Sequence, residues 1–243
     1  MQQVNFFCIN LDKRTDRWGS CVQQFRDQGI KVERWIAKPL PENRRFGAWL
    51  SHREIIEHAK NKNWEYVGVF EDDINFLNDD FLLRTQKMLD ILHEKNWYIL
   101  YFGGSMGRYS ELCKEKWLPY VLRVKGNFQA HAVIYHKRFF DIYLKKHPSE
   151  YSPKINEYYL GNKYKAFDEW FANVVQYEYP CYISNKILIT QQDDFSNIEN
   201  KIVNRNKISI YRFWAFKYLW SKISTYLDIY LCRLKSFIKT NKL

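Results

Sequence analysis

Glycine, proline and cysteine are all scarce in this sequence. Nine glycines and six prolines in 243 residues, together with 46% hydrophobic residues, exclude a flexible or low-complexity chain and predict a globular one. The five cysteines are odd in number and far apart, and no C-x-x-C pair occurs. The sequence therefore gives no sign of a zinc site or of a dithiol redox motif.

Long uncharged stretches are also missing. No run of about 18 residues lacks charge, so we expect no helix that spans a membrane. The N-terminus has no basic region followed by an apolar run, so we expect no secretory signal. These absences predict a cytoplasmic protein.

The charge is unevenly distributed. The net charge is +11, but residues 205–243 hold nine Lys and Arg residues against the single acid Asp228 and so contribute +8. Residues 1–204 are nearly balanced, which argues against a domain that binds nucleic acid. We expect a catalytic domain over 1–204 and a separate tail over 205–243.

Apolar runs and helical periodicity alternate along the first part of the chain. Short apolar runs predict strands, and the recurrence of apolar residues every three or four positions predicts helices. The strands are expected at 4–11, 30–37, 65–70, 97–102, 121–124, 130–135 and 182–190, and the helices at 16–28, 46–61, 78–94, 138–146 and 167–177. Alternation of this kind predicts an α/β fold in which helices flank a mostly parallel twisted sheet.

Two charged clusters follow predicted strands, where ligands bind in sheets of this kind. Asp12–Arg17 follows the first strand, and Glu71, Asp72 and Asp73 follow the third. Side chains two apart on an extended segment face the same way, so Glu71 and Asp73 are expected to share one side. Carboxylate oxygens held close together suit Mg²⁺ or Mn²⁺. The alternative is a solvated acidic turn that caps the next helix.

Three sequence blocks stand out: INLDKRTDR at 9–17, GAWLSHR at 47–53 and VFEDD at 69–73. Together with FDEW at 167–170 and the segment from Gln191 to Ile198, they resemble glycosyltransferase family 25. That family includes bacterial lipooligosaccharide galactosyltransferases and procollagen galactosyltransferases. The resemblance implies a type A glycosyltransferase fold and a nucleotide-sugar donor, commonly UDP-galactose. It also implies a divalent metal, Mn²⁺ or Mg²⁺, and inversion at the anomeric carbon.

The resemblance places two segments at the donor. Asp12, Arg14 and Arg17 would contact the nucleotide, while the alternative is a salt-bridged turn with Asp16 as the helix cap. Ser51 and His52 would also lie at the donor site. Since His52 falls on the apolar face of its helix, a satisfied core histidine is the alternative.

The acidic residues receive their roles from the same resemblance. Asp73 is the expected metal ligand, with Glu71 or Asp72 in support. Glu71 would bind the metal directly or contact the ribose, and Glu71 and Asp72 are both expected at the donor. Gln191 and Asp193 follow the last strand and would add a metal or phosphate contact.

Two further segments complete the expected site. Asp168 or Glu169 would be the catalytic base that an inverting transfer requires, although acids are also ordinary at the start of a helix. Gly103 and Gly104 are expected to form a turn that lets the backbone approach the donor.

The tail has the pattern of a basic amphipathic helix. At 100° per residue, its large apolar side chains between 213 and 238 fall in one arc and most of its Lys and Arg residues lie opposite. A helix of this kind suits an anionic membrane surface, so we expect peripheral attachment to the inner face of the cell membrane. The alternative is that its apolar face packs on the catalytic domain.

With what the resemblance implies, these observations predict a metal-dependent, inverting transferase that moves a hexose from a nucleotide sugar to a lipid-linked oligosaccharide. A different sugar or a protein acceptor is an open alternative. So is an inactive relative that serves as a membrane-associated scaffold.

Overall fold

The fold comes from a computed structural model, which describes residues 4–41, 43–113, 118–150, 166–192, 194–196 and 201–203. The predicted tail over 205–243 and Asp193 lie outside these residues. In the described part of the chain, no helix is both long and apolar enough to cross a bilayer.

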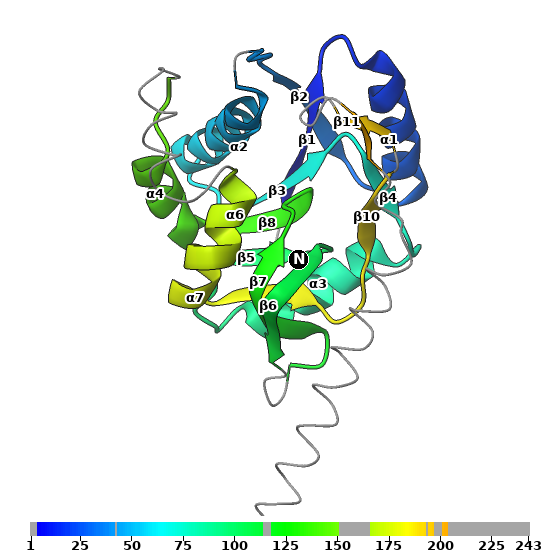
Figure 1. Cartoon of the computed structure of the whole chain (residues 1–243). Coiled ribbons are helices and arrows are strands. Elements are labelled where there is room, and N and C mark those ends of the chain that lie inside the picture. The colour runs from blue at the N-terminus through cyan, green and yellow to red at the C-terminus, as the bar shows by residue number, and fades with distance from the viewer. Residues whose placement is uncertain are drawn as a thin grey trace, which may run out of the picture.

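An eight-stranded sheet forms the centre of the described residues, in the order β2-β1-β3-β8-β5-β9-β7-β6 (Figure 1). Its strands are β1 (Asn5–Leu11), β2 (Val32–Ala37), β3 (Tyr66–Glu71), β5 (Ile99–Tyr101), β6 (Ser105–Cys113), β7 (Val121–Phe128), β8 (Ala132–His136) and β9 (Cys181–Ser184). Six of them run in one direction, and only β8 and β7 run against the rest. The predicted α/β fold with a mostly parallel sheet is confirmed.

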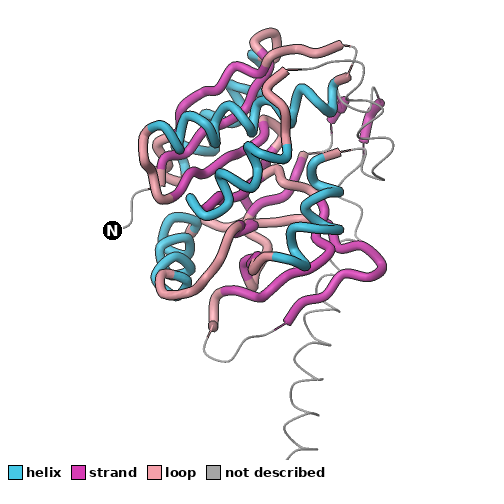
Figure 2. Tube along the Cα trace, turned by 90° about the vertical axis from the view of Figure 1, so that its left-hand side faces the viewer, coloured by secondary structure: helices cyan, strands magenta, loops and turns pink. Residues whose placement is uncertain are grey.

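Helices cover both faces of the sheet. They are α1 (Thr15–Asp27), α2 (Arg44–Asn61), α3 (Phe81–Leu92), α4 (Lys137–Lys146), α6 (Phe167–Trp170), the π-helical turn η1 (Phe171–Val175) and α7 (Gln176–Glu178). One core cluster lies beneath α2, α4 and α6, and the other lies beneath α1 and α3. Figure 1 shows these two groups on opposite sides, and Figure 2 looks onto the face that carries α2, α4 and α6.

Two small antiparallel pairs stand beside the main sheet. They are β10 (Ile189–Gln191) with β4 (Ile74–Phe76), and β11 (Asp194–Ser196) with β12 (Lys201–Val203). The predicted strand at 182–190 is therefore wrong as one element, because β9 stays in the main sheet while β10 leaves it to pair with β4. The change of partner brings Gln191 opposite Ile74, directly after the acidic cluster.

The start of α1 also differs from expectation. The helix begins at Thr15, and Asp16 lies in its first turn, where it accepts hydrogen bonds from Arg14 at 2.8–3.2 Å. Asp16 is therefore not the cap. The end of the helix is as predicted, since Gly29 follows it with φ +66°, a backbone conformation that glycine adopts most easily.

Gly68 lies in the centre of β3, where the ring of Phe6 fills the space that a Cβ atom would need. We predict that Gly68→Ala lowers the free energy of unfolding by about 1–3 kcal/mol, because Phe6 is buried and the added methyl group overpacks the core. Gly19→Ala is the control, since that glycine lies in α1 with no atom within 4 Å of the added Cβ. It should stabilise the protein by up to about 1 kcal/mol. Urea denaturation measures both, and equal effects would contradict the packing around Gly68.

Candidate functional site

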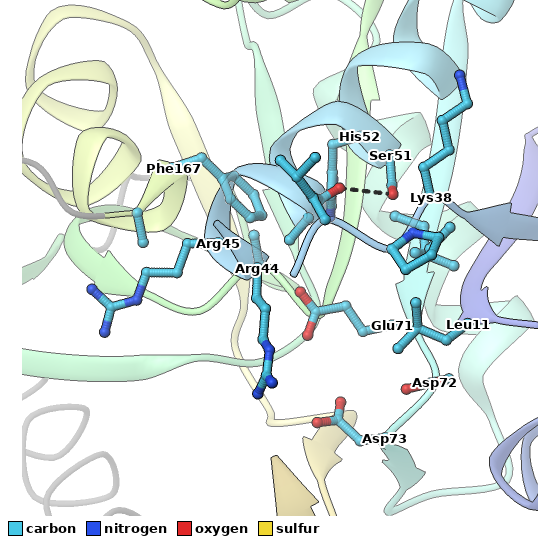
Figure 3. Close-up of a pocket in the computed structure, with 18 of the residues that line it drawn as sticks. Leu11, Lys38, Arg44, Arg45, Ser51, His52, Glu71, Asp72, Asp73 and Phe167 are labelled. Carbon is cyan, nitrogen blue, oxygen red and sulfur yellow. Dashed lines mark hydrogen bonds between the residues drawn. The ribbon is translucent and has the colours of Figure 1, made fainter. Parts of the chain in front are cut away.

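A cavity of about 620 Å³ opens where β1, β2 and β3 end (Figure 3). These three strands are parallel neighbours, so their carboxyl ends meet at one edge of the sheet. The first half of α2, the start of α6, the residues before β8 and the end of β10 form the remaining walls. Of the predicted site residues, those that line the cavity are Arg17, Ser51, His52, Glu71, Asp72, Asp73, Asp168, Glu169 and Gln191.

Glu71 and Asp73 converge on one side chain. The Gln191 amide nitrogen lies 3.2 Å from Oε2 of Glu71 and 3.1 and 3.2 Å from the two carboxylate oxygens of Asp73. The Gln192 backbone N–H donates to the Asp73 carbonyl at 2.6 Å, which fixes Gln191 beside the acidic turn. The structure thus brings Gln191 to two acids that lie about 120 positions earlier in the sequence.

Asp72 points away from this pair into a polar network. It accepts hydrogen bonds from Arg17 at 2.8 Å and from the Asn10 amide at 2.6 Å, and its side chain is only 12% exposed. Burial raises the pKa of Asp72, while Arg17 and Asn10 act in the opposite direction. Asp72 and Arg17 were both expected to bind the donor, but the structure pairs them with each other.

The acidic turn is tied to three elements through this network. Arg34 on β2 donates to the Asn10 side-chain oxygen at 3.0 Å, which leaves the Asn10 amide nitrogen to donate to Asp72. The Cys21 thiol on α1 donates to the backbone carbonyl of Asp72 at 3.2 Å. Because the Asp72 carboxylate is held by this network, the side chains of Glu71 and Asp73 on either side of it point in a different direction.

Asp12 and Arg14 do not line the cavity. The Asp12 side chain is 80% exposed and lies 3.5 Å from Arg34. Arg14 pairs with Asp16, which lowers the pKa of that carboxyl to about 2. The structure thus shows the salt-bridged turn at these residues, and contact of Asp12 and Arg14 with the nucleotide stays a prediction.

Gly103 and Gly104 also lie away from the cavity. A Cβ atom on Gly103 would overlap the backbone carbonyl of Ile189, and one on Gly104 would overlap the side-chain amide of Asn127. The two glycines let strands β10 and β7 approach this turn, and the approach of their backbone to a donor stays a prediction.

Ser51 and His52 form part of the wall contributed by α2. The Ser51 hydroxyl donates to the Gly47 carbonyl one turn earlier, at 3.0 Å (dashed in Figure 3). Nδ1 of His52 lies 2.9 Å from the Tyr135 hydroxyl, and burial lowers the pKa of His52 to about 3. His52 is thus a neutral core histidine that also borders the cavity.

Asp168 and Glu169 lie in the first turn of α6. The Asp168 carboxylate accepts from the backbone N–H groups of Gln129, at 3.2 Å, and Glu169, at 3.0 Å. Burial raises the pKa of Asp168 despite these two bonds. A carboxylate that is desolvated in a cavity wall accepts a proton more readily than an ordinary aspartate.

Basic side chains that the sequence reasoning missed share the same cavity: Lys13, Lys38, Arg44 and Arg45. Figure 3 shows Arg44 and Arg45 extending from the start of α2. The first turn of that helix holds no acid, although the helix dipole favours negative charge there. Two neighbouring arginines directly before the predicted helix at 46–61, where a helix N-terminus favours acids, were the signal that could have identified Arg44 and Arg45.

The residues that could hold a metal are few. Among the described residues, no group of three His, Cys, Asp or Glu side chains is placed to bind one ion. Glu71 and Asp73 are nevertheless close enough for one amide to contact both, and Gln191 carries an oxygen of its own. This set of oxygen atoms fits a hard cation such as Mn²⁺ or Mg²⁺.

Comparisons with known proteins show similarity in structure only. No protein-family model and no curated protein matches the sequence. A glycosyltransferase involved in the glycosylation of the major capsid of PBCV-1 is similar over 81% of this chain and 96% of its own, at 11% identity and a TM-score of 0.49. The catalytic domain of Drosophila β1,4-galactosyltransferase 7 is similar over 86% and 79%, at 9% identity and a TM-score of 0.38.

The pairing of Arg17 with Asp72 leads to a stability prediction. Arg17→Met should lower the free energy of unfolding by about 3 kcal/mol, because it leaves a buried carboxylate without its charged partner. The double variant Arg17→Met, Asp72→Asn should recover part of this loss. Lys60→Met is the control, since Lys60 and Asp141 form an exposed pair that is expected to contribute less than about 1 kcal/mol. Equal losses for the two single variants in urea denaturation would contradict the role given to the buried pair.

Proposed function

We propose that this protein is a metal-dependent glycosyltransferase that moves a hexose from a nucleotide sugar to an acceptor hydroxyl with inversion. The observation that carries the proposal is one cavity whose lining includes both the Glu71–Asp73 pair and the desolvated Asp168. The reaction needs both: a place for the leaving diphosphate and a group that takes the acceptor proton.

Glu71 and Asp73 would hold the metal, with Gln191 beside them. A bound Mn²⁺ or Mg²⁺ would neutralise the charge that develops on the departing diphosphate. Arg44 and Arg45 extend from α2 into the same cavity and supply positive charge for the phosphates. Asp72 contributes by holding the turn and stays paired with Arg17.

Asp168 is the proposed base. During inversion, the acceptor oxygen forms a bond to the anomeric carbon while the bond from that carbon to the diphosphate oxygen breaks. The hydroxyl proton passes to the carboxylate of Asp168, whose raised pKa suits that task. Glu169 also lines the cavity and stays the second candidate.

The finer assignment comes from the resemblance to glycosyltransferase family 25. It favours UDP-galactose as donor and a lipid-linked oligosaccharide as acceptor. The basic tail over 205–243 would bring the enzyme to an anionic membrane surface. The donor, the acceptor and the membrane attachment of the tail all stay predictions.

The metal site leads to a prediction on ligand binding. Mn²⁺ together with UDP should raise the melting temperature of the protein by several degrees, since about 2.7 kcal/mol is gained at a hundredfold excess over Kd. Asp73→Asn should abolish the shift, and Asp141→Asn, an exposed acid on α4, should retain it. An inactive scaffold predicts no shift with any nucleotide sugar, and an undiminished shift in Asp73→Asn would contradict this metal site.

The assignment of Asp168 leads to a prediction on pH. Since the base works as the carboxylate and burial raises its pKa, kcat/KM should fall with decreasing pH through a value above the ordinary aspartate pKa of about 3.9. Asp168→Asn should lower transfer by about 10²- to 10⁴-fold and leave the affinity for UDP unchanged. Steady-state kinetics with UDP-galactose over a pH series measure both. If Glu169→Gln causes the larger loss, Glu169 is the base and the assignment of Asp168 is wrong.

A further inference from the structure

His52 has one nitrogen with a partner and one without. Nδ1 lies 2.9 Å from the Tyr135 hydroxyl, and both side chains are fully buried (0% exposed). Among the described residues, Nε2 has no hydrogen-bond partner, although it is buried as well. A buried polar atom without a partner is costly, and His52 is among the residues that line the cavity, so this nitrogen calls for an explanation.

The partner on the other side of the ring identifies the tautomer. Among the described residues, the Tyr135 hydroxyl forms its hydrogen bond with His52. If Nδ1 carried the proton, the buried hydroxyl would accept that bond and its own proton would have no acceptor. If Nδ1 is bare, the hydroxyl donates to it and both groups are satisfied. The proton of the neutral ring therefore belongs on Nε2.

The position of His52 indicates which part of a substrate it would meet. Its ring packs against the ring of Phe167, with centroids 4.6 Å apart, and Phe167 directly precedes Asp168. In the proposed reaction, the transferred sugar lies between the diphosphate at Glu71 and Asp73 and the base at Asp168. His52 thus borders the sugar end of the cavity.

We propose that Tyr135 holds His52 as its Nε2–H tautomer, so that His52 donates a hydrogen bond to a hydroxyl oxygen of the transferred sugar. This inference rests on the proposed function and adds a residue that selects the sugar. Tyr135 acts as a positioning residue, because it touches His52 and not the substrate.

The first test compares two ligands that differ only in the sugar. In the presence of Mn²⁺, calorimetry measures the affinity of the full chain for UDP and for UDP-galactose. His52→Ala should lower the affinity for UDP-galactose about three- to tenfold, the effect of one hydrogen bond, and leave the affinity for UDP unchanged. His52→Gln offers an N–H donor and should recover most of the loss. His58→Gln, on the same helix but outside the cavity lining, should change neither affinity.

The outcomes separate this inference from the proposed function. Equal weakening of UDP and UDP-galactose by His52→Ala, or no weakening, would overturn the sugar contact while the transferase proposal stands. If the unaltered protein binds neither ligand, the proposed function and the sugar contact both fail.

The tautomer is tested without any ligand. In ¹⁵N NMR of histidine-labelled protein, with His52 assigned by its absence in His52→Gln, Nε2 should resonate as a protonated nitrogen and Nδ1 as a bare one. Tyr135→Phe removes the hydroxyl and should produce a mixture of tautomers together with a partial loss of affinity for UDP-galactose. A proton on Nδ1 in the unaltered protein would overturn the proposal. If His52→Ala fails to fold, His52→Gln and Tyr135→Phe still decide it.

Discussion

The ion pair between Arg17 and Asp72 is the interaction on which the candidate site depends. It joins α1 to the turn after β3, and the Asn10 amide joins the same carboxylate to β1. Three consecutive acids would otherwise repel one another at one point of the surface. Because the middle one is neutralised from within, Glu71 and Asp73 are both left to face the cavity. These two carboxylates repel each other, and a bound cation would relieve that repulsion.

The rest of the site is arranged around that turn by the topology of the chain. The parallel strands β1, β2 and β3 end at one edge, and β10 leaves the region of the main sheet to bring Gln191 to the acids. Asp168 arrives on the short helix α6, held by the backbone N–H of Gln129, which has φ 71°. Each wall of the cavity therefore comes from a different segment. His52 and Asp168 are desolvated because these segments pack against one another.

Much of this arrangement could be predicted from the sequence, and the reasons for the failures are physical. Apolar runs predicted the strands of the main sheet except β6, and the alternation along an extended segment predicted that Glu71 and Asp73 share a side. The pattern could not show that Asp72 is paired, since Arg17 is 55 residues away. It could not show that Gly103 and Gly104 make room for neighbouring strands, because that depends on β10 and β7 packing against them. Strand β6 was not predicted, because its sequence, SMGRYSELC, has no apolar run; it pairs with β7 through an irregular register.

A crystal structure of the protein with Mn²⁺ and UDP tests the central claim most directly. The account predicts that the metal is bound by oxygen atoms of Glu71 and Asp73 and bridges the diphosphate, while Asp72 keeps its pairing with Arg17. A metal bound by Asp72, with Arg17 released to the nucleotide, would contradict it.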